Sequence, residues 1–299
     1  MEYNHRVQIR WIAFVMSCAC VLGCQPDAPA PPVAKGAPAT TVPAPETKSA
    51  TRVVFAQSLE AQEDGLVFAL DQNQTFTGLV MDAFDIGHGQ GVIETPYRDG
   101  RPHGTSTWWH PTGQRAGTVA FLDGKADGIE TWWYADGQKM SQMSYQTGAL
   151  HGESAGWHDN GQMEWQAQWQ MGRPEGNYTE WGETGGRRSL RQYHKGAREG
   201  LETHWHANGK PLLEVQWQGD NKSGEQREWY ASGERMGVTP FNNGTQEGNG
   251  TRWHQNGTIG SKITYQAGKP IHRQEWKEDG TPVDLTEDGW QKDGSPRAP

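Results

Sequence analysis

From residue 104 onward, the chain alternates short β-forming stretches with glycine-containing turns. In residues 213–217 and 263–265, apolar and polar side chains alternate, as on a strand with one buried face. Residues 105–110 are rich in β-branched and aromatic side chains and form too short a run for a helix, so they also predict a strand. No helical period is found after residue 52. The pattern therefore predicts an all-β fold.

A repeat of 24 residues orders these stretches. Its first residue is a glycine, a tryptophan follows five residues later, and another aromatic residue stands seven residues before the glycine. A period of this length indicates copies of one supersecondary unit stacked side by side. The repeat glycines are Gly104, Gly128, Gly152, Gly176, Gly200, Gly224 and Gly248.

Each copy is predicted to be one β-hairpin, because Asn-Gly or Asp-Gly pairs such as Asn160-Gly161 favour hairpin turns. The copies are predicted to join across residues 53–284 as an elongated, single-layer antiparallel β-meander built from 24-residue repeats. The repeat tryptophans and the second aromatic column are expected to pack ring on ring as a thin core.

The N-terminus has the features of an export signal. Arg6 and Arg10 precede an apolar run at residues 11–22, which is too short to span a bilayer and has the length of a signal-peptide core. Residues 21–24 (Val-Leu-Gly-Cys) resemble the lipobox of bacterial lipoproteins. The resemblance implies a signal peptide at 1–23, lipidation of Cys24 and, because Gln25 is not aspartate, export to the outer membrane. The alternative is an ordinary cleaved secretion signal.

The remaining composition narrows the function. Residues 24–52 carry the lipidated cysteine and a Pro/Ala-rich stretch, which predicts a disordered tether, and the polar residues 285–299 predict a disordered tail. A net charge of −9 argues against a nucleic-acid partner. The sequence contains no phosphate loop, nucleophile elbow or zinc-protease motif, and a one-layer sheet gives carboxylates little burial. We therefore expect neither catalysis nor a cofactor.

Residues 145–152 and 193–200, each followed by a tryptophan-centred strand, resemble the MORN repeat and more closely its bacterial variant. The resemblance covers about residues 64–283. It implies a sheet used as a scaffold with protein or membrane partners. Bacterial proteins of the variant type are often labelled antitoxins of toxin–antitoxin modules.

Two groups of side chains are candidates for a site. Trp108, Trp132 and Trp165 stand outside the tryptophan column of the repeat, so alternation places the first two on the opposite face from that column, where they could bind a ligand or simply be exposed. His204 and His206 face the same side of one strand, but no third metal ligand is evident, so no metal is expected.

Three functions follow from these features. The favoured hypothesis is a lipoprotein that touches the membrane only through its lipid anchor and binds a still unknown protein partner through the repeats. The second is a module that binds a polysaccharide or peptidoglycan through its exposed tryptophans. The third is an antitoxin or immunity-type protein, as the family label suggests.

Overall fold

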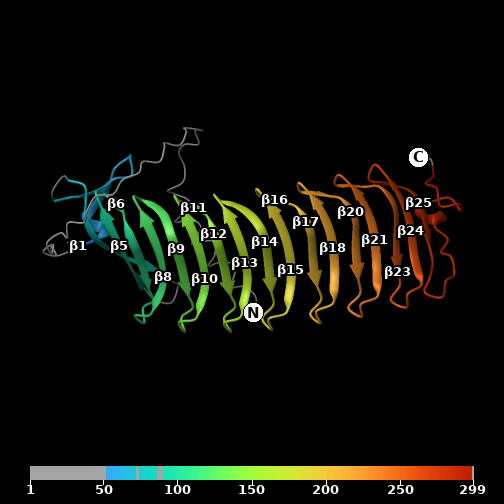
Figure 1. Ribbon diagram of the computed structural model, residues 1–299, viewed down its shortest axis with the longest axis horizontal. Helices are drawn as coiled ribbons and strands as arrows, with labels where there is room; N and C mark the ends of the chain where they lie inside the picture. The colour runs from blue at the N-terminus through green and yellow to red at the C-terminus, as the bar shows by residue number, and fades with distance from the viewer. Residues whose placement is uncertain (1–51, 72–73, 86–89, 298–299) are drawn as a thin grey trace, which may run out of the picture. The chain divides into compact units, whose positions relative to one another are not determined.

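The computed structural model describes residues 52–71, 74–85 and 90–297. The predicted signal peptide, Cys24 and almost all of the predicted tether therefore lie outside the described residues. Within the described part, nearly every element is a strand of one open sheet, and consecutive strands follow one another across it (Figure 1). None of the described helical segments is long and apolar enough to cross a membrane. The all-β antiparallel meander predicted from the repeat is confirmed.

Each 24-residue copy forms one hairpin whose first strand begins at or before the repeat glycine and ends at the repeat tryptophan. The first strands are β7 (Gly104–Trp109), β9 (Lys125–Trp133), β12 (Gly152–Trp157), β14 (Arg173–Trp181), β17 (Gly200–Trp205), β20 (Gly224–Trp229) and β23 (Gly248–Trp253). The second strands are β8 (Arg115–Leu122), β10 (Lys139–Gln146), β13 (Met163–Gln170), β15 (Arg187–His194), β18 (Pro211–Gln218), β21 (Arg235–Asn242) and β24 (Ile259–Gln266). Two-residue strands lead into several copies: β6 (Arg101–Pro102), β11 (Ala149–Leu150), β16 (Ala197–Arg198), β19 (Asn221–Lys222) and β22 (Thr245–Gln246).

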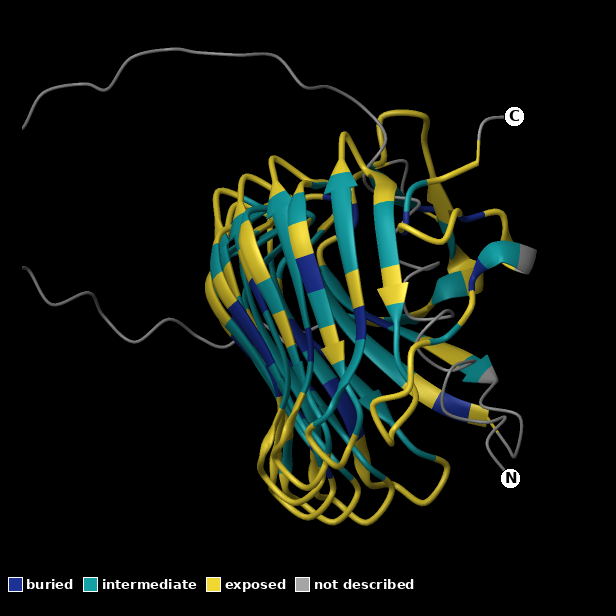
Figure 2. Ribbon diagram, turned by 90° about the vertical axis from the view of Figure 1, so that its right-hand side faces the viewer, coloured by how far each residue is buried: buried dark blue, intermediate teal, exposed yellow. Residues whose placement is uncertain are grey.

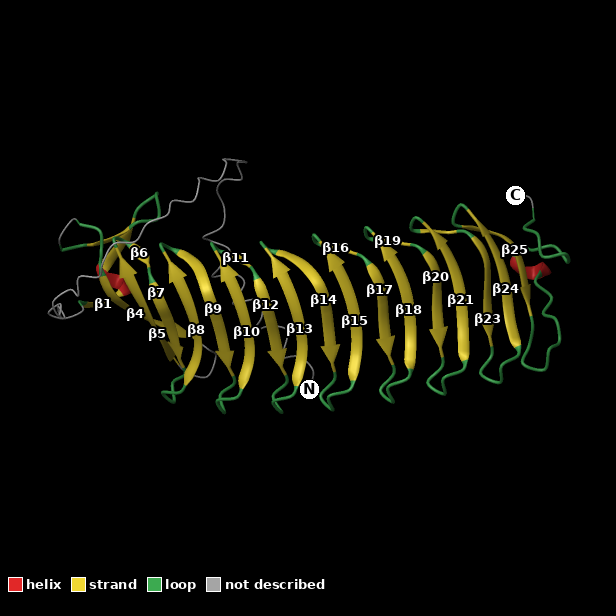
Figure 3. Cartoon of the chain, viewed as in Figure 1, coloured by secondary structure: helices red, strands yellow, loops and turns green. Residues whose placement is uncertain are grey.

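The turns differ between the two sides of the sheet at which the strands end (Figure 3). Between one copy and the next lies a two-residue turn in which both residues have positive φ, as at Asp123 (48°) and Gly124 (85°). This backbone matches the twist of a tight hairpin. The reversed pair Gly219-Asp220 adopts the same conformation, with φ of 56° and 64°, so exchanging the glycine's place leaves the turn unchanged.

Within each copy, the two strands are joined by a longer turn that ends in a glycine with positive φ, and in three copies an asparagine precedes this glycine. The Gly161 N–H donates to the carbonyl of His158, and Asn160 Oδ1 accepts from the Gln162 N–H at 2.9 Å. The Asn160 amide also donates to the carbonyl of Glu183 in the next copy at 2.7 Å. Asn208 and Asn256 make the same contact with the copy that follows each of them. These turns therefore bond neighbouring hairpins as well as close their own.

The ends of the sheet depart from the repeat. At the N-terminal end, β1 (Val53–Phe55) pairs in parallel with β4 (Gly78–Asp85), which is followed by β5 (Gln90–Arg98). A separate hairpin is formed by β2 (Leu59–Ala61) and β3 (Val67–Ala69), and a 3-10 turn, η1 (Ala56–Ser58), precedes it. Phe76 is 1% exposed at the centre of a small apolar cluster with Ala69 and Val80. This is where the described residues form a conventional core.

The C-terminal end is covered by chain that the sequence predicts to be disordered from residue 285. Beyond the last strand, β25 (Lys269–Glu275), the chain turns back through η2 (Thr286–Asp288). Leu285 and Trp290 are buried, and the Arg273 N–H of β25 donates to the carbonyl of Gly294 at 2.8 Å. Although this segment is polar in composition, its two apolar side chains are buried here. The described residues 285–297 are therefore ordered and lie against the last strand of the sheet.

Candidate functional site

One row of side chains runs across the whole repeat sheet. Each member lies directly opposite the next one on the neighbouring strand, so all of them share one face of the sheet. The members four residues after the repeat glycines are large, except Gly156, over which Trp165 of the neighbouring strand lies, and small or medium residues stand between them. In order, this cross-sheet row is Trp108, Gly117, Trp132, Ser141, Gly156, Trp165, Glu180, Ser189, His204, Leu213, Glu228, Gly237, Arg252, Ser261 and Glu275.

The first half of the row, from β7 to β13, is aromatic. The rings of Trp108 and Trp132 lie 5.3 Å apart between centroids at an angle of 52°. Trp132 lies over Gly117 and Trp165 over Gly156, so closely that a Cβ at either glycine would strike the indole. Trp165 also stacks on Tyr178 of the next strand, with 6.3 Å between centroids and 7° between planes. Glycine therefore makes room for each ring to lie across its neighbour's strand.

The second half of the row, from β14 to β25, is charged. His204 Nε2 lies 2.6 Å from Oε1 of Glu202, which precedes it by two residues on the same face. Arg191 lies between two carboxylates, with Nη1 3.1 Å from Glu180 Oε1 and Nε 3.3 Å from Glu202 Oε1. The Ser189 hydroxyl completes this cluster by donating to Glu180 at 2.6 Å. The same face therefore changes from stacked rings to a network of ion pairs.

A buried glutamate lies beside each half of the row, and the pKa values of the two carboxyls are shifted in opposite directions. Glu130 is 2% exposed, and burial raises the pKa of its carboxyl even though the Trp132 indole N–H donates to Oε1 at 2.5 Å. Glu202 is 6% exposed. Burial also acts to raise the pKa of Glu202, but the hydrogen bond from His204 and the charges of His204, Arg191 and Arg198 outweigh it, so the pKa is lowered. Figure 2 shows such buried positions in the middle of the strands, between exposed turns.

The column of repeat tryptophans does not form the ring-on-ring core that the sequence suggests. Equivalent residues of successive copies are two strands apart, roughly 10 Å at the usual strand spacing, which is too far for direct stacking. Cations occupy the space instead. The Arg115 guanidinium lies 5.9 Å from the ring centroid of Trp109 and 5.5 Å from that of Trp133. Lys139 and Arg187 each lie over a single ring of the column, that of Trp157 and of Trp205 respectively.

In several copies the residue directly after the repeat tryptophan, a histidine or a tyrosine, joins neighbouring copies through its side chain. His206 Nε2 donates to the backbone carbonyl of Trp229 in the next copy at 2.9 Å, and Tyr230 Oη donates to that of Trp253 at 2.7 Å. His158 and His254 make equivalent contacts. His204 and His206 therefore have separate partners, Glu202 and Trp229. No group of three or more potential metal ligands occurs in the described residues.

The three tryptophans singled out in the sequence, Trp108, Trp132 and Trp165, are half-buried members of one row. The structure brings the rings of Trp108 and Trp132 into contact, whereas two strands lie between Trp132 and Trp165. It also adds Glu180, Glu228 and Arg252, which sequence reasoning missed, and His204, which sequence reasoning considered only as a metal ligand. Their shared place, four residues after the repeat glycine, was a signal that could have identified them with Trp108 and Trp132. Trp165 has a different place in the repeat and enters the row only through strand pairing.

Comparison with known proteins supports one part of the sequence interpretation. The chain matches the MORN repeat variant at residues 126–147 and 198–218. Each segment covers one hairpin of the repeat: nearly all of β9 and the whole of β10 in the first match, and β17 and β18 in the second. No curated protein matches the chain. The matches support a MORN-repeat protein, and such repeats are commonly non-catalytic and bind proteins or membranes.

Proposed function

We propose that this MORN-repeat protein is an exported lipoprotein, anchored through Cys24, whose repeat sheet binds a protein partner without catalysing a reaction. The observation that carries the proposal is the cross-sheet row. It presents half-buried tryptophans beside a charged network on one continuous face. Aromatic residues and arginine are the side chains that most often dominate the binding energy of protein interfaces.

The row favours a partner whose surface is apolar opposite the tryptophans and charged or polar opposite the second half of the row. Trp108, Trp132 and Trp165 offer ring edges and faces that suit an apolar anchor. Beyond Tyr178, the same face offers ionised side chains whose charges are already arranged by neighbours such as Arg191. A partner that lies along the sheet would place apolar side chains on the first half of the row and charged or polar ones on the second.

Site-specific photo-crosslinking tests the interface. A photoreactive phenylalanine analogue replaces Trp132 in one variant and Ile129 in a second, matched variant. Ile129 lies on the same strand, is 46% exposed and points to the opposite face. In intact cells, the probe at position 132 is expected to form an adduct with a specific protein that the probe at 129 does not form. Equal adducts from both positions, or none from 132, would contradict the proposal.

The anchor is tested separately through Cys24. The proposal expects wild-type protein in the membrane fraction, labelled by metabolic palmitate, and Cys24→Ser protein that is unlabelled but still folded. The fold is expected to persist because the Pro/Ala-rich residues that follow Cys24 separate it from the repeats. Soluble, unlabelled wild-type protein would remove the lipoprotein part of the proposal while leaving the crosslinking result standing.

A further inference from the structure

A groove of about 340 Å³ lies in the charged half of the sheet, over β19 to β24. It lies on the same face as the cross-sheet row, because Glu228, Arg252 and Ser261 of that row line it. Its floor contains Gly250, the second residue after a repeat glycine. The other copies have a side chain at this place: Ser106, Glu130, Ser154, Tyr178, Glu202 and Gln226. The groove therefore exists where one copy lacks the side chain that fills this level of the sheet.

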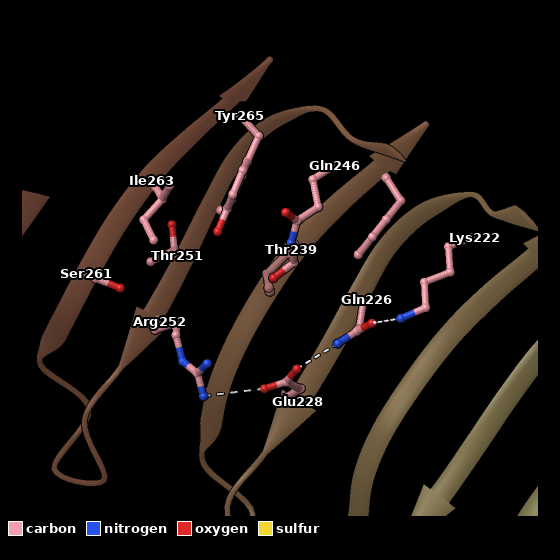
Figure 4. A pocket seen from close by; sticks show the side chains of 13 residues that line it. Lys222, Gln226, Glu228, Thr239, Gln246, Thr251, Arg252, Ser261, Ile263 and Tyr265 are labelled. Carbon is pink, nitrogen blue, oxygen red and sulfur yellow. Dashed lines mark hydrogen bonds and ion pairs between the residues drawn. The ribbon is translucent and has the colours of Figure 1, made fainter. Parts of the chain in front are cut away.

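Aromatic rings form one side of the groove. Phe241 and Tyr265 line it from the second aromatic column of the repeat. Figure 4 shows the Tyr265 ring beside the groove. The Tyr265 ring borders the floor, since its Cε2 would stand 3.3 Å from a Cβ at Gly250. Lys222 Nζ lies 4.9 Å from the Phe241 ring centroid, which leaves a cation beside the rings.

Polar side chains in a fixed chain of hydrogen bonds form the other side (Figure 4). Lys222 Nζ donates to Gln226 Oε1 at 2.7 Å, and Gln226 Nε2 donates to Glu228 Oε1 at 2.7 Å. Arg252 Nη2 lies 3.6 Å from Glu228 Oε2, and its side chain is 59% exposed. This distance is too long for a good hydrogen bond, so the guanidinium retains N–H groups that are available to a ligand.

We propose that this groove binds the ring of an acidic sugar, a pyranose that carries a carboxylate. An aromatic wall suits the apolar face of a pyranose, while the amide and carboxylate of Gln226 and Glu228 suit its hydroxyls. The charged lining residues are Lys222, Glu228 and Arg252, which sum to one positive charge in a chain of net charge −9. Arginine binds carboxylates with two parallel hydrogen bonds, so the local excess of cations selects the acidic sugar over a neutral one. The groove shares Glu228 and Arg252 with the charged half of the row, and it is tested with sugar probes alone, so its outcome is distinguishable from that of the protein partner.

The test compares two probes that differ only in the carboxylate. Binding of oligogalacturonate and of a neutral galactose oligomer with the same α-1,4 linkage and equal length is measured by calorimetry with the full chain. The acidic oligomer is expected to bind about tenfold more tightly, because a charge-assisted hydrogen bond contributes roughly that factor. Equal affinity for the two oligomers, or no binding of the acidic one, would overturn the proposal.

Three variants locate the binding. Arg252→Met is expected to weaken acidic oligomer binding by about tenfold and to leave the neutral oligomer unchanged. Gly250→Gln, which restores the side chain found at Gln226, is expected to weaken both. Arg227→Met removes the same charge from a residue outside the groove, on the opposite face, and is expected to change neither. If Arg227→Met weakens binding as much as Arg252→Met, the effect is one of overall charge and the site is wrong. Circular dichroism of each variant verifies that the sheet is intact.

Discussion

Glu130 and Glu202 occupy the same place in their repeats, two residues after the repeat glycine, and both are buried, yet their surroundings differ. Glu130 lies among Trp132, Tyr145 and the rings of the aromatic half, and its pKa is raised by burial. Glu202 lies beside His204, Arg191 and Arg198 in the charged half, and its pKa is lowered despite burial. One backbone repeat therefore supports two kinds of interior, because the side chains on the same and the neighbouring strands, and not the place in the repeat, decide what surrounds the buried carboxyl.

The largest expected effect comes from Trp132, on which the aromatic half depends. Trp132→Ala removes the ring that covers Gly117, its contact with Trp108 and the N–H that donates to Glu130. We expect a loss of about 3 kcal/mol in the free energy of unfolding, measured by urea denaturation. Trp132→Phe keeps a ring over the glycine and should cost less. Equal losses for the two variants would show that the indole N–H, and not the covering ring, matters.

Adding a methyl group at two glycines of the row should separate the halves. Gly117→Ala places a Cβ against the Trp132 ring, and we expect it to cost about 2 kcal/mol through overpacking. Gly237→Ala in the charged half meets its nearest atom, Glu228 Oε2, at an ordinary 3.5 Å, and should be close to neutral. Both glycines have extended backbones, so only the neighbouring side chain differs. Thermal unfolding of both variants measures the contrast, and similar losses would remove the distinction.

The smallest effect, on the order of 1 kcal/mol, is expected from replacing the two carboxyls by amides. The raised pKa of Glu130 means that its ionised form costs stability above that pKa, and the cost disappears as pH falls through it toward the ordinary value. Glu130→Gln should therefore stabilise the protein at neutral pH, and the gain should vanish on acidification. The lowered pKa of Glu202 means that its contribution is present above the ordinary value and is lost as pH falls through the lowered one. Glu202→Gln should therefore destabilise at neutral pH.

Unfolding curves of both variants and the wild type, recorded from about pH 7 to about pH 3, distinguish these cases. The difference between Glu202→Gln and wild type should persist to a lower pH than the difference for Glu130→Gln. Shifts of the same sign at neutral pH would show that the two carboxyls share one environment after all.

Much of the fold could be predicted because its signals are local. The two-residue turns and the Asn-Gly turns depend on residues that are close together in the sequence. The 24-residue period then predicts that one hairpin forms in every 24 residues. The expected packing of the repeat tryptophans was wrong because tryptophans of successive copies lie two strands apart in the sheet. The ordered end of the chain was missed because Leu285 and Trp290 are isolated apolar residues in a polar segment.

The sequence by itself determined the repeat, the strand and turn types and the presence of three tryptophans outside the repeat column. These follow from backbone preferences and from the alternation of side chains along one strand. Only the tertiary structure decided which side chains meet across strands. Register placed Trp165 in the same row as Trp132, set Arg191 between Glu180 and Glu202, and left a groove above Gly250. Cross-strand neighbours are set by the pairing of whole strands and their bulges, and so the chemistry of the face emerges only when the sheet is assembled.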